Sequence, residues 1–194
     1  MKGERLNPTL WRTCRVLAGA TRVRMLRLLM TSPAPTVTEV AGCLGIGLSR
    51  ASQELRRLNS RGLLEVHRSG AEVRYRLGAD PQVADAAGLT AAIHAGLRSC
   101  GAARDEVFVR IASCFTHPRR LEIVRAMLRG PQTPGMLRRA TGIPYRALKR
   151  HLALLHDRQV LRREDGEYRL SACRHPLFRA IVTCLRSDTA PDPS

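Results

Sequence analysis

Apolar residues along the chain form the same helical stripe twice. Residues 48–59 and the part of residues 142–161 that begins at Tyr145 each carry large or small aliphatic side chains at spacings of three and four, which is the period of one helix face. We expect both segments to be amphipathic helices that bury this stripe. The first stripe is Leu48, Ala51, Leu55 and Leu58, and the second is Leu148, Leu152 and Leu155.

Turn signals and strand-like alternation flank both helices. Thr36 is placed to cap a short helix over 37–44, and glycines at 45 and 47 form the turn before the first amphipathic helix. Gly142 and Pro144 mark the equivalent turn before the second. After each helix come two alternating segments, 64–66 with 73–77 and 161–163 with 168–170, separated by Ser-Gly and Asp-Gly turns. A helix-turn-helix followed by a hairpin is a winged helix.

The two units match at a nearly constant offset of about 97 residues, as Thr36 with Thr133 and Leu55 with Leu152 illustrate. The predicted fold is therefore mainly α with small β-hairpin wings, as two tandem winged-helix domains joined by a helix. The predicted boundaries are 10–78 for the first domain, 79–103 for the connecting helix, 104–186 for the second domain with its C-terminal helix, and 187–194 for a polar tail.

Charge indicates a polyanionic partner. The chain has 33 basic and 16 acidic residues and a net charge of +17. Residues 1–78 carry a net +9 and residues 104–186 a net +11, whereas the segment between them is nearly neutral. Two basic blocks that coincide with two predicted winged helices favour nucleic acid as the partner.

The outer faces of the two predicted helices and the hairpins supply the candidate contacts. Arginine reads guanine edges and phosphates, and glutamine pairs with adenine. The first unit offers a mixed set suited to reading bases, and the second offers a more purely cationic set suited to non-specific affinity. The predicted DNA-binding residues are Ser49, Arg50, Ser52, Gln53, Arg56, Arg57, Arg68, Arg74, Tyr145, Arg146, Lys149, Arg150, Arg162 and Arg163.

Two motifs resemble the ArsR-type (arsenic-repressor-like) winged-helix regulators. The run Phe115–Val124, with Pro118 and Arg120 inside it, resembles the first signature of that family, and Leu17–Leu26 is its counterpart in the first unit. The tetrad Lys149-Arg150-His151-Leu152 resembles the end of the family's recognition helix, and 52–55 occupies the equivalent place. The resemblance implies a bacterial, cytoplasmic transcriptional regulator, more often a repressor, that binds double-stranded DNA.

The sequence departs from the metal-sensing members of that family. The helix before the first recognition helix has a single cysteine, Cys43, and its counterpart over 135–138 has none. Asp85 and His94 are nine residues apart and do not share a helix face as the family's second metal site requires. We expect no metal and no cofactor. The six cysteines are isolated, without a CxxC pair, and are expected to be free thiols.

Other classes of protein are less consistent with these features. No catalytic set of nucleophile, base or paired carboxylates is apparent, so we expect no enzyme. No apolar run is long enough for a membrane span, and the first residues lack a signal segment, so a cytoplasmic protein without a membrane partner is expected. Residues 79–103 and 176–185 are expected to pair, either within one chain as a pseudo-dimer or between two chains. The alternatives are a winged-helix protein-interaction module and a non-specific architectural or RNA-binding protein.

Overall fold

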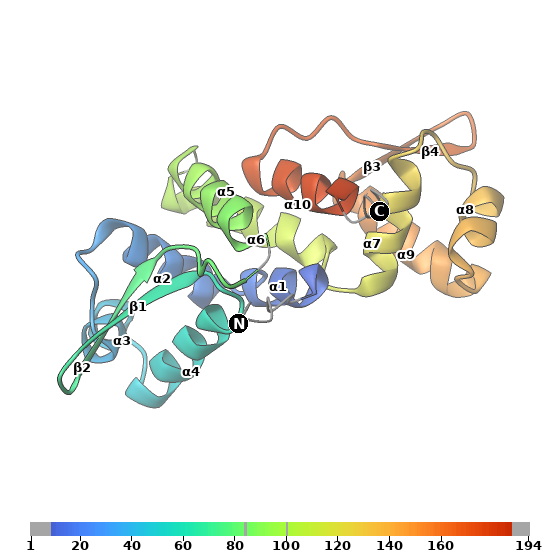
Figure 1. Ribbon diagram of the computed structural model, residues 1–194. Coiled ribbons are helices and arrows are strands. Elements are labelled where there is room, and N and C mark those ends of the chain that lie inside the picture. Colours follow the sequence, from blue (N-terminus) through green and yellow to red (C-terminus); the bar gives the residue numbers. More distant parts are fainter. Residues whose placement is uncertain (1–8, 84, 100, 188–194) are drawn as a thin grey trace, which may run out of the picture.

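The computed structural model describes residues 9–83, 85–99 and 101–187, so most of the predicted polar tail and Cys100 lie outside the described residues. The chain runs twice through the same order of elements (Figure 1). The first half is α1 Leu10–Leu17, α2 Ala20–Thr31, α3 Val37–Leu44, α4 Leu48–Asn59, β1 Leu64–Ser69, β2 Glu72–Leu77 and α5 Ala86–Ser99. After a 3-10 turn at Ala102–Arg104, the second half is α6 Asp105–Cys114, α7 Pro118–Met127, α8 Pro134–Thr141, α9 Tyr145–Asp157, β3 Leu161–Glu164, β4 Glu167–Leu170 and α10 Pro176–Ser187. The mainly helical class with small hairpins is confirmed.

The two hairpins are antiparallel and differ in length. In the first, Leu64 pairs with Leu77 and the strands have six residues each, whereas in the second Leu161 pairs with Leu170 and the strands have four. The second turn has positive φ at both Asp165 and Gly166, the signature of a tight two-residue hairpin turn. In both halves the hairpin also bridges the segment that precedes the short helix, through Thr36 with Arg74 and Gln132 with Tyr168.

One hydrophobic core runs through both halves. Helix α5 packs mainly against α10, and α1 packs against α6, so each of these helices contacts its own counterpart in the repeat. Aromatic side chains from neighbouring elements meet there, with the rings of Phe115 and Phe178 6.0 Å apart between centroids. Figure 1 shows these helices between α3, α4 and the first hairpin on one side and α8, α9 and the second hairpin on the other.

A polar clamp also joins the halves. Arg27 on α2 donates from Nη2 to the Asp105 carboxylate at 2.5 Å and from Nη1 to the Leu97 carbonyl at 2.9 Å. Both side chains of the ion pair are mostly buried, with 22% and 17% exposed. A guanidinium that bonds a carboxylate and a backbone carbonyl of the other elements fixes their orientation as well as their distance.

Two expectations from the sequence are wrong in detail. The connecting helix occupies Ala86–Ser99 rather than all of 79–103, because residues 81–82 form a turn and Asp85 has a left-handed φ of 61°. The apolar stripe predicts Leu48 inside, but its side chain is 56% exposed. It lies at the edge of the stripe and at the first residue of α4. At the opposite edge Glu54 is buried instead, with 7% exposed.

Candidate nucleic-acid interface

Each half presents a short capped helix, a glycine turn and a longer helix with a polar outer face. In the first half the Thr36 hydroxyl accepts from the Glu39 N–H, and Glu39 accepts from the Thr36 N–H, which forms a capping box. In the second half the Thr133 hydroxyl accepts from Met136 N–H. Gly45 and Gly142 then end these helices with φ of 63° and 65°, a conformation that glycine adopts without strain. The sequence predicted both caps and both turns.

The first outer face lies on α4. Ala51, Leu55 and Leu58 are buried as predicted, which leaves the opposite face of α4 to solvent. Along that face Ser49, Gln53 and Arg56 are exposed and Ser52 is half-buried. Arg50 is also exposed, and its guanidinium donates a long hydrogen bond of 3.4 Å to the Thr21 hydroxyl.

The second outer face lies on α9 and is more strongly cationic. Tyr145, Arg146, Lys149 and Arg150 are all exposed. The Lys149 ammonium lies 5.7 Å from the centre of the Tyr145 ring, within cation–π range. Among the described residues no carboxylate forms an ion pair with Arg146, Lys149 or Arg150, so this charge is uncompensated on the helix surface.

The arginines predicted to bind DNA from the hairpins differ in whether they contact other residues of the chain. Arg68 is exposed, near the tip of the first hairpin. Arg74 is instead held in the middle of β2, where it pairs with Glu72 at 3.0 Å and donates to the Ala34 carbonyl. In the second hairpin Arg162 pairs with Glu164 at 3.3 Å, and the Arg163 guanidinium lies over the ring of Tyr168.

Behind α4, a buried ion-pair network fixes the helix. Glu54 accepts from Arg22 at 2.8 Å and from Arg57 at 3.0 Å. Burial raises the pKa of the Glu54 carboxyl, but the hydrogen bonds and charges of Arg22 and Arg57 outweigh it and leave that pKa below its ordinary value. Arg57, one of the predicted DNA contacts, is therefore partly committed to holding α4 in place.

Behind α9 the equivalent place has no carboxylate. In the repeat, His151 stands where Glu54 does, at an offset of 97, and Arg120 stands where Arg22 does, at an offset of 98. Arg120 is only 8% exposed, and no described carboxylate pairs with it. The rings of His117 and His151 lie 4.9 Å apart between centroids. Burial lowers the pKa of both imidazoles. The charge of Arg120 lowers the pKa of His117 further, and the charges of His117 and then of Arg120 lower the pKa of His151 further.

Sequence reasoning missed several surface residues on the same elements. Leu48 is exposed at the start of α4, and Met136, Arg138 and Arg139 are exposed on α8. The arginine pair at 138 and 139 was visible as a basic run in a helix that otherwise carries little charge. For Leu48 the sequence held no contrary signal, because a leucine at stripe spacing is ordinarily buried.

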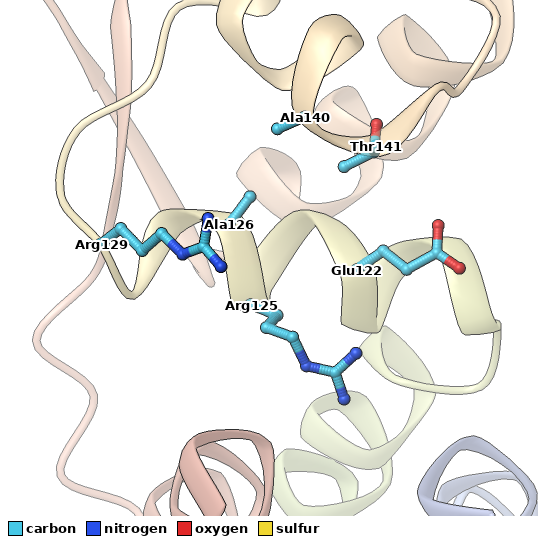
Figure 2. A pocket seen from close by; sticks show the side chains of 6 residues that line it. All are labelled: Glu122, Arg125, Ala126, Arg129, Ala140 and Thr141. Carbon is cyan, nitrogen blue, oxygen red and sulfur yellow. The ribbon is translucent and has the colours of Figure 1, made fainter. Parts of the chain in front are cut away.

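Pockets in the described part of the chain are open hollows. Figure 2 shows one between α7 and α8, of about 230 Å³, where Ala126 is directed toward Ala140 and Glu122 and Arg129 lie at its sides. That volume is below the range that encloses an ordinary small-molecule ligand. A larger hollow of about 510 Å³ lies between α2 and α6, beside the Arg27–Asp105 clamp.

Metal-ligating side chains and thiols are dispersed over the described residues. Across 9–83, 85–99 and 101–187, no group of three or more His, Cys, Asp or Glu side chains is close enough to hold a metal ion. Cys14, Cys43, Cys114 and Cys173 are free thiols.

No helix in the described ranges is both long enough and apolar enough to cross a membrane.

In comparison with known proteins, no protein-family model matches the chain, and no curated protein matches it either.

Proposed function

We propose that the chain is a sequence-specific double-stranded DNA-binding transcriptional regulator with two tandem winged helices and two recognition helices, α4 and α9. The observation that carries the proposal is the repeated outer face: each half has a capped short helix, a glycine turn and a helix whose exposed side is rich in arginine, lysine, glutamine and serine. In a helix-turn-helix, the second helix enters the major groove and its N-terminal residues contact base edges.

The contact chemistry differs between the two faces. Ser49, Ser52 and Gln53 can exchange hydrogen bonds with base edges, so α4 supplies most of the sequence discrimination. Arg146, Lys149 and Arg150 carry charge without ion-pair partners among the described residues, so α9 supplies more of the electrostatic affinity for phosphates. The regulated site is therefore asymmetric. Repression by occupying a promoter in a bacterial cytoplasm is the mode that the resemblance to ArsR-type regulators suggests.

We further propose that one chain acts as its own pseudo-dimer. Counterpart helices pair in the repeat, α1 with α6 and α5 with α10, as they do across a two-fold axis between identical subunits. A single chain then presents both recognition helices to one duplex. A homodimer through the same helices would instead require these surfaces to open, because each already covers the other.

The test is a fluorescence-anisotropy titration against genomic duplexes, including the region upstream of the gene, at roughly 50 and 200 mM salt. The wild type should prefer some duplexes by about 10³-fold or more and bind them as one chain per duplex. Changing Arg50 and Gln53 to Ala should reduce that preference. Changing Arg146, Lys149 and Arg150 to Ala should weaken binding to all duplexes and lower the salt slope by about one for each phosphate that the variant no longer neutralises.

A charge-matched control separates the interface from bulk electrostatics. Three exposed arginines lie on α5, on α10 and in the 3-10 turn before α6: Arg98, Arg179 and Arg104. Their change to Ala removes the same charge away from α4 and α9, so it should leave the preference among duplex sequences intact. Tight binding without preference would support the architectural alternative, and preference for RNA the RNA-binding one. No binding to any duplex at low salt would overturn the proposal and leave the protein-interaction module.

A further inference from the structure

We infer that Leu48 contacts the 5-methyl group of a thymine, and that together with Gln53 it makes α4 a reader of A·T base pairs. The inference rests on the proposed function and deepens it by naming the bases that one recognition helix selects. Leu48 belongs to the first amphipathic stripe by its spacing, yet the structure turns its side chain outward.

The exposed large apolar side chains lie on the elements of the two helix-turn-helix units. In the described residues they are Leu48, 56% exposed, Tyr145, 51% exposed, and Met136, 38% exposed. A single exposed leucine is ordinary in a soluble protein. Leu48 and Tyr145, however, occupy the same position of the repeat, the first residue of α4 and of α9. Both halves thus place a large apolar group at the end of the helix that would enter the groove.

The two equivalent positions differ in their neighbours. The ring of Tyr145 is accompanied by the Lys149 ammonium at 5.7 Å, so that position is part of a cationic surface. Leu48 has no polar atom in its side chain, and the residue one turn along the same face is Ser52. Leu48 is therefore an aliphatic group set in a face that otherwise offers only hydrogen-bonding groups.

The major groove offers few apolar partners for such a group. Among the base edges there, the prominent apolar feature is the thymine 5-methyl group. Gln53 is exposed on the same helix, and its amide makes no hydrogen bond within the described residues, so both ends of the amide are available to adenine N6 and N7. A methyl contact from Leu48 and an amide contact from Gln53 select the same kind of base pair.

The experiment uses the full chain and a duplex selected from a random pool by the wild type. Each thymine of that duplex is replaced in turn by deoxyuridine, which removes only the methyl group. Affinities are measured for the wild type, for Leu48→Ala and for Leu48→Met, which keeps an apolar chain of similar size. Met136→Ala is the matched control, since it also removes an exposed apolar side chain from a helix-turn-helix. Thermal unfolding of each variant verifies that the exposed positions leave the fold intact.

One thymine should respond selectively. Its replacement should weaken the wild type and Leu48→Met by about fourfold, the effect of burying one methyl-sized group, and should not affect Leu48→Ala. Met136→Ala should respond as the wild type does. If the wild type binds its selected duplex but every deoxyuridine affects Leu48→Ala as much as it affects the wild type, the Leu48 assignment is wrong and the DNA-binding function stands. Failure to select any duplex would overturn both.

Discussion

At the residue scale, the two halves differ in the side chain that lies beside the arginine behind α4 and behind α9. Arg22 is balanced by Glu54 behind α4, whereas Arg120 behind α9 faces His151 and has no described carboxylate partner. A buried charge without a partner is costly, and removing one partner of a buried pair leaves such a charge behind. Arg120 does donate to the Thr116 hydroxyl, but no described carboxylate balances its charge, so we expect this site to be less stable than its counterpart in the first half.

Adding a carboxylate at position 151 and removing the one at position 54 should change the stability in opposite directions. His151→Glu places a carboxylate near Arg119, Arg120 and Arg150, and we expect it to increase the free energy of unfolding by about 1 kcal/mol or more. Glu54→Gln leaves Arg22 without its charge partner and should cost about 3 kcal/mol. Urea unfolding at neutral pH measures both changes. A destabilising His151→Glu would show that Arg120 is adequately solvated or bonded as it stands.

The histidine pair also predicts a pH dependence. Burial and neighbouring guanidiniums hold the pKa of His117 and of His151 below the ordinary value of 6.5. The unfolded chain then binds more protons than the folded one as the pH falls below about 6.5, so the free energy of unfolding should decrease with acidification through that range. Above about pH 6.5 both histidines are neutral in the folded and in the unfolded chain, so they add no pH dependence to the free energy of unfolding there.

Urea unfolding between about pH 8 and pH 5.5 measures this slope. The double variant His117→Gln with His151→Gln should flatten it in part. His175, whose pKa burial also lowers, remains in that variant and keeps the rest of the slope. Identical slopes for wild type and double variant would mean that the pair stays neutral or charged equally in both states.

At the element scale, local signals are what the sequence predicts well. The caps at Thr36 and Thr133, the glycine turns and the alternating hairpins each depend on a few neighbouring residues, and all of them lie where expected. The burial of Glu54 and Arg120 and the exposure of Leu48 depend instead on which side of the helix meets the rest of the half. That rotation is set by tertiary partners such as Arg22, which are distant in sequence and which no local pattern reveals.

The caps give a prediction that belongs to these elements. Thr36→Ala removes one side of a capping box and Thr133→Ala removes a single hydroxyl acceptor, so each should cost about 1 kcal/mol, with the larger loss at Thr36. Thr183 is a suitable control, because its hydroxyl donates to the Arg179 carbonyl of its own helix, and Thr183→Ala should be nearly neutral. Chemical denaturation compares the three. Equal, negligible losses at both caps would show that tertiary packing alone holds α3 and α8.

At the scale of the whole molecule, shared packing fixes the positions of α4 and α9, the two proposed recognition helices, relative to each other. The core is continuous across the halves, α5 lies on α10, and Arg27 clamps α2 to Asp105. This joint differs from a flexible linker, across which two DNA-binding domains would adjust to any separation of their half-sites. The charge blocks, the repeat and the pairing of 79–103 with 176–185 were visible in the sequence. The contact of α1 with α6, and the choice between pairing within one chain and pairing between two, depend on tertiary packing that no local pattern specifies.

A rigid joint makes the spacing of the DNA contacts a measurable property. Footprinting first locates the two contacted segments of a selected duplex, and base pairs are then inserted between them. Inserting about five base pairs turns one contacted groove to the far side of the duplex, and inserting about ten restores its direction but moves it by one helical turn, ~34 Å. A chain whose halves share one core cannot move α4 and α9 to match either insertion. Both insertions should therefore reduce the affinity to that of binding through α4 alone, which is measured with the variant that has Arg146, Lys149 and Arg150 changed to Ala. If the ten-base-pair insertion retained full affinity, the halves would have to separate on DNA, and the buried faces of α5 and α10 would then have to tolerate exposure to water.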